Sequence, residues 1–522
     1  MIGLELLVAV AAVVLVGTVI GRRLHISPPV VLLACGVLIG LLPTIGDVQL
    51  PPDVVLLIFL PALLFWESLT ISLQQVRQNY RGIALAGTVL VVLSAGAVAL
   101  VAHAFGLPWG PAWILGAAVA PTDATAVAVL GRLLPFRRMT ALRAESLVND
   151  GTALVLYSVA VTATVSTRPG ALSIAGQFVA SYVVGIAVGL AVAYAGFVLR
   201  RTLADPLLGN TATVLVPFVA YLVAEELHGS GVLAVVAAGI VLGQAAPRIG
   251  RSATRHQSET FWTLVTFWLN AALFVLVGVR LPSVVDGLSS NRVGHALLIV
   301  LAVVAVLLVV RIAFVFASSW LIAAADRRRH GEGQLASGRY RLVSGLAGFR
   351  GAISLAIALS VPEFTDAGAP LPYRDTVIFV TAGVIVVTLA QGLILPRVVR
   401  WAGFAPDTGL SKQRRLAETA AEEAALDALP QFVDEQHIDP AVGEQVRLEI
   451  EQHLLHLTEP DTEGPLTGRQ EYLRLRLALI GTKRATILRL RDERTIDDTV
   501  LRTIQSTLDL EELRLRAYDA HG

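Results

Sequence analysis

The chain has 522 residues, of which 55% are hydrophobic and 16% are charged, with a formal net charge of +1 and a mean hydropathy of +0.69. A water-soluble protein of this length does not have this balance, so the composition excludes a soluble globular protein and indicates a membrane protein. The single cysteine, Cys35, excludes an intrachain disulfide and a zinc cluster.

Apolar runs are confined to the first part of the chain, whereas the last part is rich in Glu, Arg, Asp and Gln. We therefore predict a transmembrane domain over residues 1–402 and a helical cytoplasmic domain over 403–522. A bilayer crossing needs about 20 apolar residues, or fewer where the helix is short or broken. The runs predict an all-α fold with thirteen spans, at about 2–20, 29–43, 53–70, 82–104, 110–131, 144–166, 171–199, 208–224, 230–246, 260–279, 293–323, 339–361 and 375–399.

The arginines provide an independent test of this count, because short loops rich in Lys or Arg stay in the cytoplasm. Alternate loops are rich in arginine, from Arg22 and Arg23 in the first to Arg339 and Arg341 in the last, and the intervening loops hold only Arg168, Arg280, Arg292 and Arg374. The alternation predicts an outside N-terminus and a cytoplasmic C-terminus. An odd count also permits two inverted six-span repeats plus one linking helix, in which the fifth span corresponds to the twelfth.

The fifth and twelfth spans both contain residues that weaken a helix. The fifth carries Pro121, Thr122 and Asp123, and a proline in mid-span removes a helical hydrogen bond and frees carbonyl groups that can bind a cation. The twelfth carries three glycines around one charged residue: Gly345, Gly348, Arg350 and Gly351. Both patterns predict broken helices. The alternative is a kinked packing helix without a ligand.

The sixth span opens with a cluster of oxygen-bearing side chains. Ser146 lies four residues before Asp150 and three before Asn149, so all three share one helix face. Such oxygens suit sodium or potassium better than sulfur or imidazole would. At about 1.5 Å per residue, Asp150 and Asp123 lie at similar depth from the predicted cytoplasmic end. The cluster predicts a cation site, and the alternative is a polar helix start in cytosolic water.

The region from Gly116 to Tyr157, with these two motifs, resembles the bacterial NhaP-type sodium/proton antiporters, which belong with the animal sodium/proton exchangers. Further matches follow in the expected order over most of residues 50–400: the runs that begin at Phe59, Ala224, Phe261, Gly348 and Gln391.

The resemblance implies a role for each residue of the cluster. Asp150 is the titrating carboxylate that binds either the cation or the proton. Ser146 and the backbone of Thr122 supply further cation ligands, and Asn149 and Asp123 support the site. An Asn before the carboxylate goes with electroneutral one-for-one exchange.

The resemblance also implies an ion pair between Glu145 and Arg350, which joins the sixth span to the twelfth, and a homodimer. One departure concerns the third span, where Trp66 occupies the position of a family acidic residue and Glu67 follows. Glu67 either reaches the site as a ligand through a local bulge or faces the cytoplasmic vestibule. For Arg311, also similar to a family arginine, we expect an ion pair between helices.

We therefore predict a secondary antiporter of the plasma membrane, not an enzyme, that exchanges protons for Na⁺, with Li⁺ or K⁺ left open. The proton and the cation compete for Asp150, and the site opens alternately to the two sides. The alternatives are a K⁺/H⁺ antiporter of the same fold, a cation channel, an intramembrane hydrolase and a sensor. We expect no cofactor and no nucleic-acid partner, and the C-terminal domain shows no nucleotide loop, metal pattern or catalytic set.

The C-terminal domain shows helical spacing at 413–430 and 441–457 and long charged helices within 467–517. This pattern predicts a small helical bundle, for which assembly or stability is favoured over ligand-dependent regulation.

Overall fold

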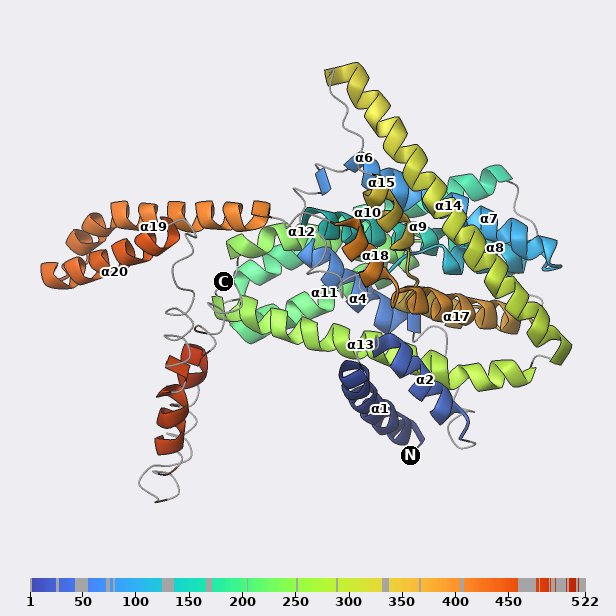
Figure 1. Ribbon diagram of the computed structural model, residues 1–522, viewed down its shortest axis with the longest axis horizontal. Coiled ribbons are helices and arrows are strands. Elements are labelled where there is room, and N and C mark those ends of the chain that lie inside the picture. The colour runs from blue at the N-terminus through green and yellow to red at the C-terminus, as the bar shows by residue number, and fades with distance from the viewer. Residues whose placement is uncertain are drawn as a thin grey trace. The chain divides into compact units, whose positions relative to one another are not determined.

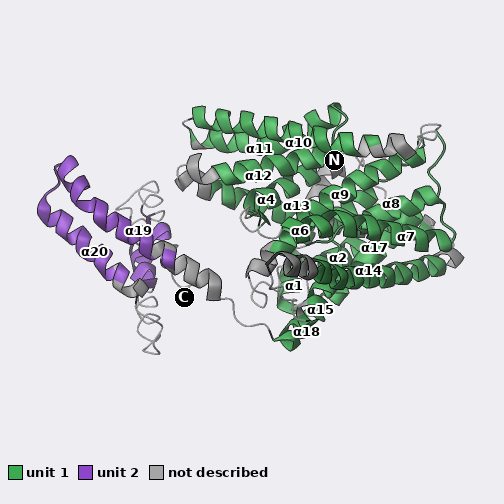
Figure 2. Cartoon of the chain, turned by 90° about the horizontal axis from the view of Figure 1, so that it is seen from above, with its two compact units in different colours: residues 1–407 green, residues 408–522 purple. Residues whose placement is uncertain are grey.

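The structure, a computed structural model, describes residues 2–24, 28–42, 55–71, 76–77, 80–123, 136–165, 171–203, 205–249, 252–287, 290–330, 338–365, 368–403, 408–458 and short stretches between 476 and 515. The regular elements in these ranges are helices, and one isolated bridge joins Phe364 to Pro370. The chain forms two compact units, residues 1–407 and 408–522 (Figure 2).

Unit 1 contains a helix in each range that the sequence predicts to span the membrane (Figure 1). In chain order its elements are α1 (Ile2–Leu24), α2 (Pro28–Gly40), the π-helix η1 (Val55–Phe59), α4 (Leu60–Thr70), α6 (Tyr80–Ala84), the π-helix η2 (Leu85–Val89), α7 (Leu90–Ala104), α8 (Trp109–Val119), α9 (Phe136–Val165), α10 (Ala171–Thr202), α11 (Pro206–Glu226), α12 (Gly231–Ile249), α13 (Ser252–Gly287), α14 (Ser290–His330), α15 (Gly338–Leu346), α16 (Ala352–Leu359), α17 (Arg374–Gln391) and α18 (Leu395–Ala402).

Seven helical stretches among the described residues are long and apolar enough to cross a bilayer, and four shorter apolar helices accompany them. Their outer faces are apolar. On α10, Val183, Leu190 and Tyr194 are exposed, and Leu298 and Leu301 are exposed on α14. Exposure of so much apolar surface to water is unfavourable, whereas its contact with lipid chains is not. These faces are those of a multi-pass membrane protein.

The helices of unit 1 pack as two groups. The first, which we call the scaffold group, contains α1, α2, α4 and α10–α13; the second, the bundle group, contains α7–α9 and α14–α17. Figure 2 shows α10, α11 and α12 side by side in the scaffold group and α7, α14 and α17 together in the bundle group. Contacts of α13 with α16 and α17, and of α4 with α9, join the two groups.

Helices α2 and α13 of the scaffold group approach each other closely, and this approach depends on glycine. A Cβ atom on Gly36 would lie 2.3 Å from the carbonyl oxygen of Val275, and one on Gly278 would lie 2.4 Å from that of Leu33. Neither position has room for a side chain. Close contact through small residues holds helices together in a membrane, where lipid removes most of the hydrophobic driving force.

Both helices predicted to break are broken. Helix α8 ends at Val119, and residues 121–123 are not helical; residues 347–351 separate α15 from α16. The backbone groups released by these breaks find partners across the bundle group. The Asp123 amide donates to the Phe349 carbonyl at 2.8 Å, and Gln391 Nε2 donates to the Leu346 carbonyl at 3.0 Å. Such replacement partners make unwound backbone tolerable at membrane depth.

Unit 2 is helical in its described part, with α19 (Thr408–Glu435) and α20 (Pro440–Thr458) packed on each other. These helices contain the predicted ranges 413–430 and 441–457. Much of the predicted helical range 467–517 lies outside the described residues. Its described part contributes a small apolar cluster of Ile480, Ile487 and Leu508.

Candidate cation site

A small cavity lies where the scaffold and bundle groups meet. Its volume is about 20 Å³, and because one water molecule needs about 10–15 Å³, it has room for one small occupant. The scaffold group contributes one wall and the bundle group the other. The lining residues are Leu63, Glu67 and Asn270 from the scaffold group, and Pro121, Thr122, Asp123, Asp150, Gly351, Ile353 and Ser354 from the bundle group and its unwound segments.

Helix α9 presents the predicted polar cluster to this region. Ser146, Asn149 and Asp150 are buried, as expected for three residues on one helix face within a packed protein. Ser146 Oγ donates to the Thr122 carbonyl at 2.5 Å, and Asn149 Nδ2 donates to Thr122 Oγ1 at 2.8 Å. Thr122 and Asp150 line the cavity, whereas Ser146 and Asn149 lie behind them, are not among the lining residues and hold Thr122 in place.

Asp123 lies against the second unwound segment. A Cβ atom on Gly351 would lie 1.6 Å from Asp123 Oδ2, so the carboxylate fits only because residue 351 is glycine. The 2.8 Å bond from the Asp123 amide to the Phe349 carbonyl fixes the same contact through the backbone. Asp123 thus joins the two broken helices directly at the cavity wall.

Glu67 lines the cavity, so of the two positions left open by the sequence it occupies the one near the site. Helix α4 is regular from Leu60 to Thr70, and the one-turn π-helix η1, which is a local bulge, directly precedes it. Trp66, at the position where the family has an acidic residue, packs instead on Trp262 of α13, with ring centroids 6.3 Å apart.

The predicted ion pair between Glu145 and Arg350 is wrong. Glu145 Oε1 pairs instead with Arg311 Nη2 on α14, at 2.9 Å. Arg350 Nε donates to the Val119 carbonyl at 2.9 Å, and its Nη1 donates to the Gly348 carbonyl at 2.5 Å. The physical reason is that both broken helices leave carbonyl groups in need of donors, and a guanidinium with five N–H groups satisfies several at once. Arg311 forms the interhelical ion pair that we expect of it.

Three carboxylates, those of Glu67, Asp123 and Asp150, lie within electrostatic range of one another around the cavity. Three ionised carboxylates in a small buried space repel one another, and water is too scarce there to screen them. A bound proton or a bound monovalent cation relieves this repulsion. The chemistry of the cavity therefore favours a small cationic occupant.

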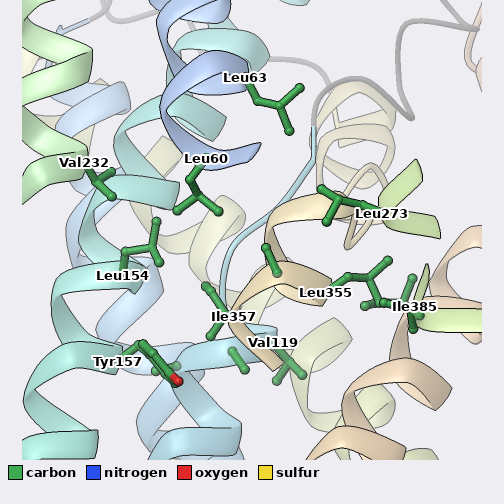
Figure 3. Close-up of a cluster of buried hydrophobic side chains, with 14 of the residues drawn as sticks. Leu60, Leu63, Val119, Leu154, Tyr157, Val232, Leu273, Leu355, Ile357 and Ile385 are labelled. Atoms are coloured by element: carbon green, nitrogen blue, oxygen red, sulfur yellow. The ribbon is translucent and has the colours of Figure 1, made fainter. Parts of the chain in front are cut away.

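A cluster of buried apolar side chains includes residues from the two helices that carry Glu67 and Asp150 (Figure 3). On α9, Leu154 and Tyr157 follow Asp150 by one and two turns, and on α4 Leu60 precedes Glu67 by two turns. Val119 and Ile357 join them, and all five side chains are buried. Closely packed apolar side chains offer no ligands for an ion that has lost its water.

Sequence reasoning assigns no role to two residues of this region, Asn270 and Ser354, which lie in the resembling runs that begin at Phe261 and Gly348. It predicts the ion pair of Arg311 but does not identify Glu145 as the partner. The signal available was a polar residue in an otherwise apolar span, as Asn270 is within 260–279. Which span faces which cavity depends on tertiary packing, and the sequence alone does not give it.

Comparison with known proteins agrees with this architecture. A family model described as "Sodium/hydrogen exchanger, transmembrane" matches residues 9–401. An uncharacterised Na⁺/H⁺ exchanger of Mycobacterium tuberculosis is 42% identical over 521 residues, which cover 98% of this chain and 96% of that protein. The Na⁺/H⁺ antiporter ApNhaP of Aphanothece halophytica is 30% identical over 429 residues, covering 81% of this chain and 77% of that protein.

Among solved structures, the sodium proton antiporter of Methanocaldococcus jannaschii at pH 8 superimposes with a TM-score of 0.60. The match covers 77% of this chain and 100% of that chain, at 20% sequence identity. At this sequence identity, the match shows that the two chains share a fold and shows nothing more.

Proposed function

The chain belongs to the sodium/hydrogen exchanger family, and from this premise we propose that it exchanges protons for Na⁺ across the plasma membrane through a single site at Asp150. Membership of the family makes it a secondary transporter of the cation:proton exchange class and not an enzyme. Li⁺ and K⁺ suit the same oxygen ligands, so a K⁺/H⁺ antiporter of the same fold is the alternative.

The proposal rests above all on the cavity, in which a buried carboxylate meets uncharged oxygens at a boundary between two helix groups. Asp150 accepts either a proton or the cation, and Ser146 and the Thr122 carbonyl complete the cation's ligands. Asn149 and Asp123 hold these ligands in position. Glu67 faces the cation from the scaffold group. Because one carboxylate serves both ions, binding of one displaces the other, and this competition couples the two fluxes.

Transport follows from the placement of the site between two groups that can move against each other. An empty, ionised Asp150 is costly to carry through the low-dielectric interior, so the bundle group moves when the site holds a proton or a cation. The apolar cluster around Leu154 and Tyr157 offers an ion no ligands. Such a cluster favours a carrier over a channel, which needs a continuous hydrated path.

We propose the topology that the arginine pattern predicts: thirteen crossings, the N-terminus outside and residues 403–522 in the cytoplasm. The breaks in α8 and in α15–α16 support two inverted six-span repeats with one linking helix, since they occupy corresponding positions. The scaffold group forms the contact between two copies in a homodimer. Exchange is electroneutral, one proton for one cation, in line with an Asn beside the carboxylate.

The test is exchange in proteoliposomes that contain a pH-sensitive dye, with Na⁺, Li⁺ or K⁺ added across a range of pH. We expect wild-type protein to move protons on addition of at least one of these cations, and Asp150→Asn to abolish this movement while the purified protein stays monodisperse. Asp205→Asn is the matched control, because Asp205 caps α11 at an exposed position and Asn preserves a cap. Cation-driven proton movement by Asp150→Asn vesicles at the wild-type rate would overturn the proposal.

A further inference from the structure

Two uncharged polar side chains of the cavity wall have no place in the exchange scheme above. Ser354 comes from the first turn of α16 in the bundle group, and Asn270 comes from α13 in the scaffold group. The acidic residues account for why the cavity attracts a cation. They do not account for which cation it holds.

Ser354 is the stronger observation. Its side chain is 1% exposed, it lines the cavity, and its hydroxyl oxygen has no hydrogen-bond partner in the structure. Neighbouring hydroxyls on α9 are satisfied: Thr152 donates to the Val148 carbonyl at 2.9 Å, and Ser146 donates to that of Thr122. A buried hydroxyl without a hydrogen-bond partner lowers stability. Alanine at position 354 would therefore be more stable than serine if the hydroxyl had no function.

Asn270 supplies a second neutral oxygen from the opposite helix group. It sits half-buried in the middle of α13, among the apolar residues Leu269, Ala271 and Leu273. A polar amide at membrane depth is unfavourable unless it serves a purpose, and here it faces the same space as Ser354. The two side chains lie on opposite walls, one moving with Asp150 and one with Glu67.

Neutral oxygens matter because of what they replace. An ion that enters a cavity with room for one small occupant leaves most of its hydration water outside, and fixed oxygens must take its place. The smallest ions bind water most tightly and lose most when one oxygen of the set is missing. The carboxylates attract any monovalent cation, so discrimination among Li⁺, Na⁺ and K⁺ falls to the neutral ligands.

We propose that Ser354 and Asn270 are cation ligands that set the selectivity of the site among the alkali cations. The inference rests on the proposed function, because it assigns to the same cavity the ions that exchange with protons. It adds two uncharged ligands, one from each helix group, so that the bound ion contacts both groups.

The experiment measures exchange by full-length wild type and by Ser354→Ala and Asn270→Ala in proteoliposomes, with LiCl, NaCl and KCl titrated separately at fixed pH. Losing one neutral ligand should raise KM for Li⁺ and Na⁺ about two- to tenfold and raise KM for K⁺ less, so that selectivity shifts toward K⁺. The maximal rate at saturating cation should stay within about twofold of wild type, because the carboxylate that exchanges ions is intact.

Thr381→Val is the matched control. Thr381 lies in α17, is buried, and also has a hydroxyl oxygen without a partner, but it does not line the cavity. Its substitution removes an unsatisfied hydroxyl that is equally buried and should leave the order of KM values for the three cations unchanged.

A second readout does not depend on transport. Ligand binding raises the thermal unfolding midpoint of purified protein, so Na⁺ should stabilise wild type and the control more than the Ser354 and Asn270 variants. If Ser354→Ala fails to fold, Ser354→Gly and Asn270→Ala provide the same comparison. Unchanged KM ratios in both cavity variants, or an equal shift in Thr381→Val, would overturn the inference. A wild type that shows no cation-driven proton movement would instead overturn the proposed function.

Discussion

Arginines of the two units lie in different environments: Arg311 and Arg350 are buried in unit 1, and Arg447 is exposed in unit 2. In unit 1, Arg311 and Arg350 are only 3% and 4% exposed, and each has defined partners in the packed interior. In unit 2, Arg447 contacts Glu444 and Glu451 along the surface of α20, and these three side chains are 49%, 54% and 39% exposed. The hydrogen bond from Arg447 holds the pKa of the Glu444 carboxyl below its ordinary value.

The difference shows where a substitution has consequences. Water competes for an exposed ion pair and screens it, so such a pair contributes little to stability. Water does not reach a buried pair, so removal of one partner leaves the other charge unpaired in a medium of low dielectric constant. The buried charges of unit 1 are therefore individually important, whereas the exposed charges of unit 2 are individually dispensable.

The largest effect is expected at the buried pair of Glu145 and Arg311. Glu145→Gln strands the guanidinium of Arg311 and should destabilise the protein by about 3–5 kcal/mol. Arg311→Gln should cost less, because Glu145 is 16% exposed and can be hydrated. The measurement is thermal or denaturant unfolding of purified variants in detergent, followed by tryptophan fluorescence.

A double-mutant cycle decides between the two possible arginine partners. Glu145→Gln and Arg311→Gln should be strongly coupled, whereas Glu145→Gln and Arg350→Gln should be close to additive, since Arg350 bonds to backbone carbonyls. Stronger coupling with Arg350 than with Arg311 would restore the ion pair that the sequence predicted.

A smaller effect on stability is expected at Gly351. The Cβ atom of Gly351→Ala collides with the Asp123 carboxylate, and overpacking of this kind typically costs about 1–3 kcal/mol. Because Asp123 must move away from the cavity wall, the exchange rate of this variant should fall even though the purified protein stays folded. Gly294→Ala is the control, since nothing lies within 4 Å of that position. Wild-type exchange by Gly351→Ala would contradict the tight contact described here.

The smallest effect on transport is expected from removal of unit 2. A chain that ends at Asp407 retains every residue of the cavity and should exchange cations within about twofold of the full chain, because a compact unit can fold alone. Dye-quench assays on equal amounts of reconstituted protein provide the measurement. A truncated chain that folds but does not exchange would assign the tail a direct part in transport.

Much of the fold could be predicted because the bilayer constrains it. Apolar runs place the helices, and Pro121 and the glycines around Arg350 predict the two breaks. The face shared by Ser146 and Asp150 follows from helical spacing, which is a local property.

What the sequence did not reveal depends on contacts between distant segments. The choice of Arg311 over Arg350 as the partner of Glu145 follows from how the broken helices cross. The cavity positions of Ser354 and Asn270 depend on the rotation of α16 and α13 about their axes. No spacing rule within one helix contains that information.

The ion pair of Glu145 with Arg311, and the contact of Asp123 and Arg350 with the two broken helices, bear on how membrane voltage acts on the proposed cycle. All four charges belong to the bundle group and its unwound segments, two positive and two negative, so together they sum to zero. Moving one net elementary charge across the membrane involves about 2.3 kcal/mol per 100 mV. In the proposed cycle a protonated or cation-bound Asp150 is neutral, so these four charges and the loaded site together carry no net charge through the membrane field.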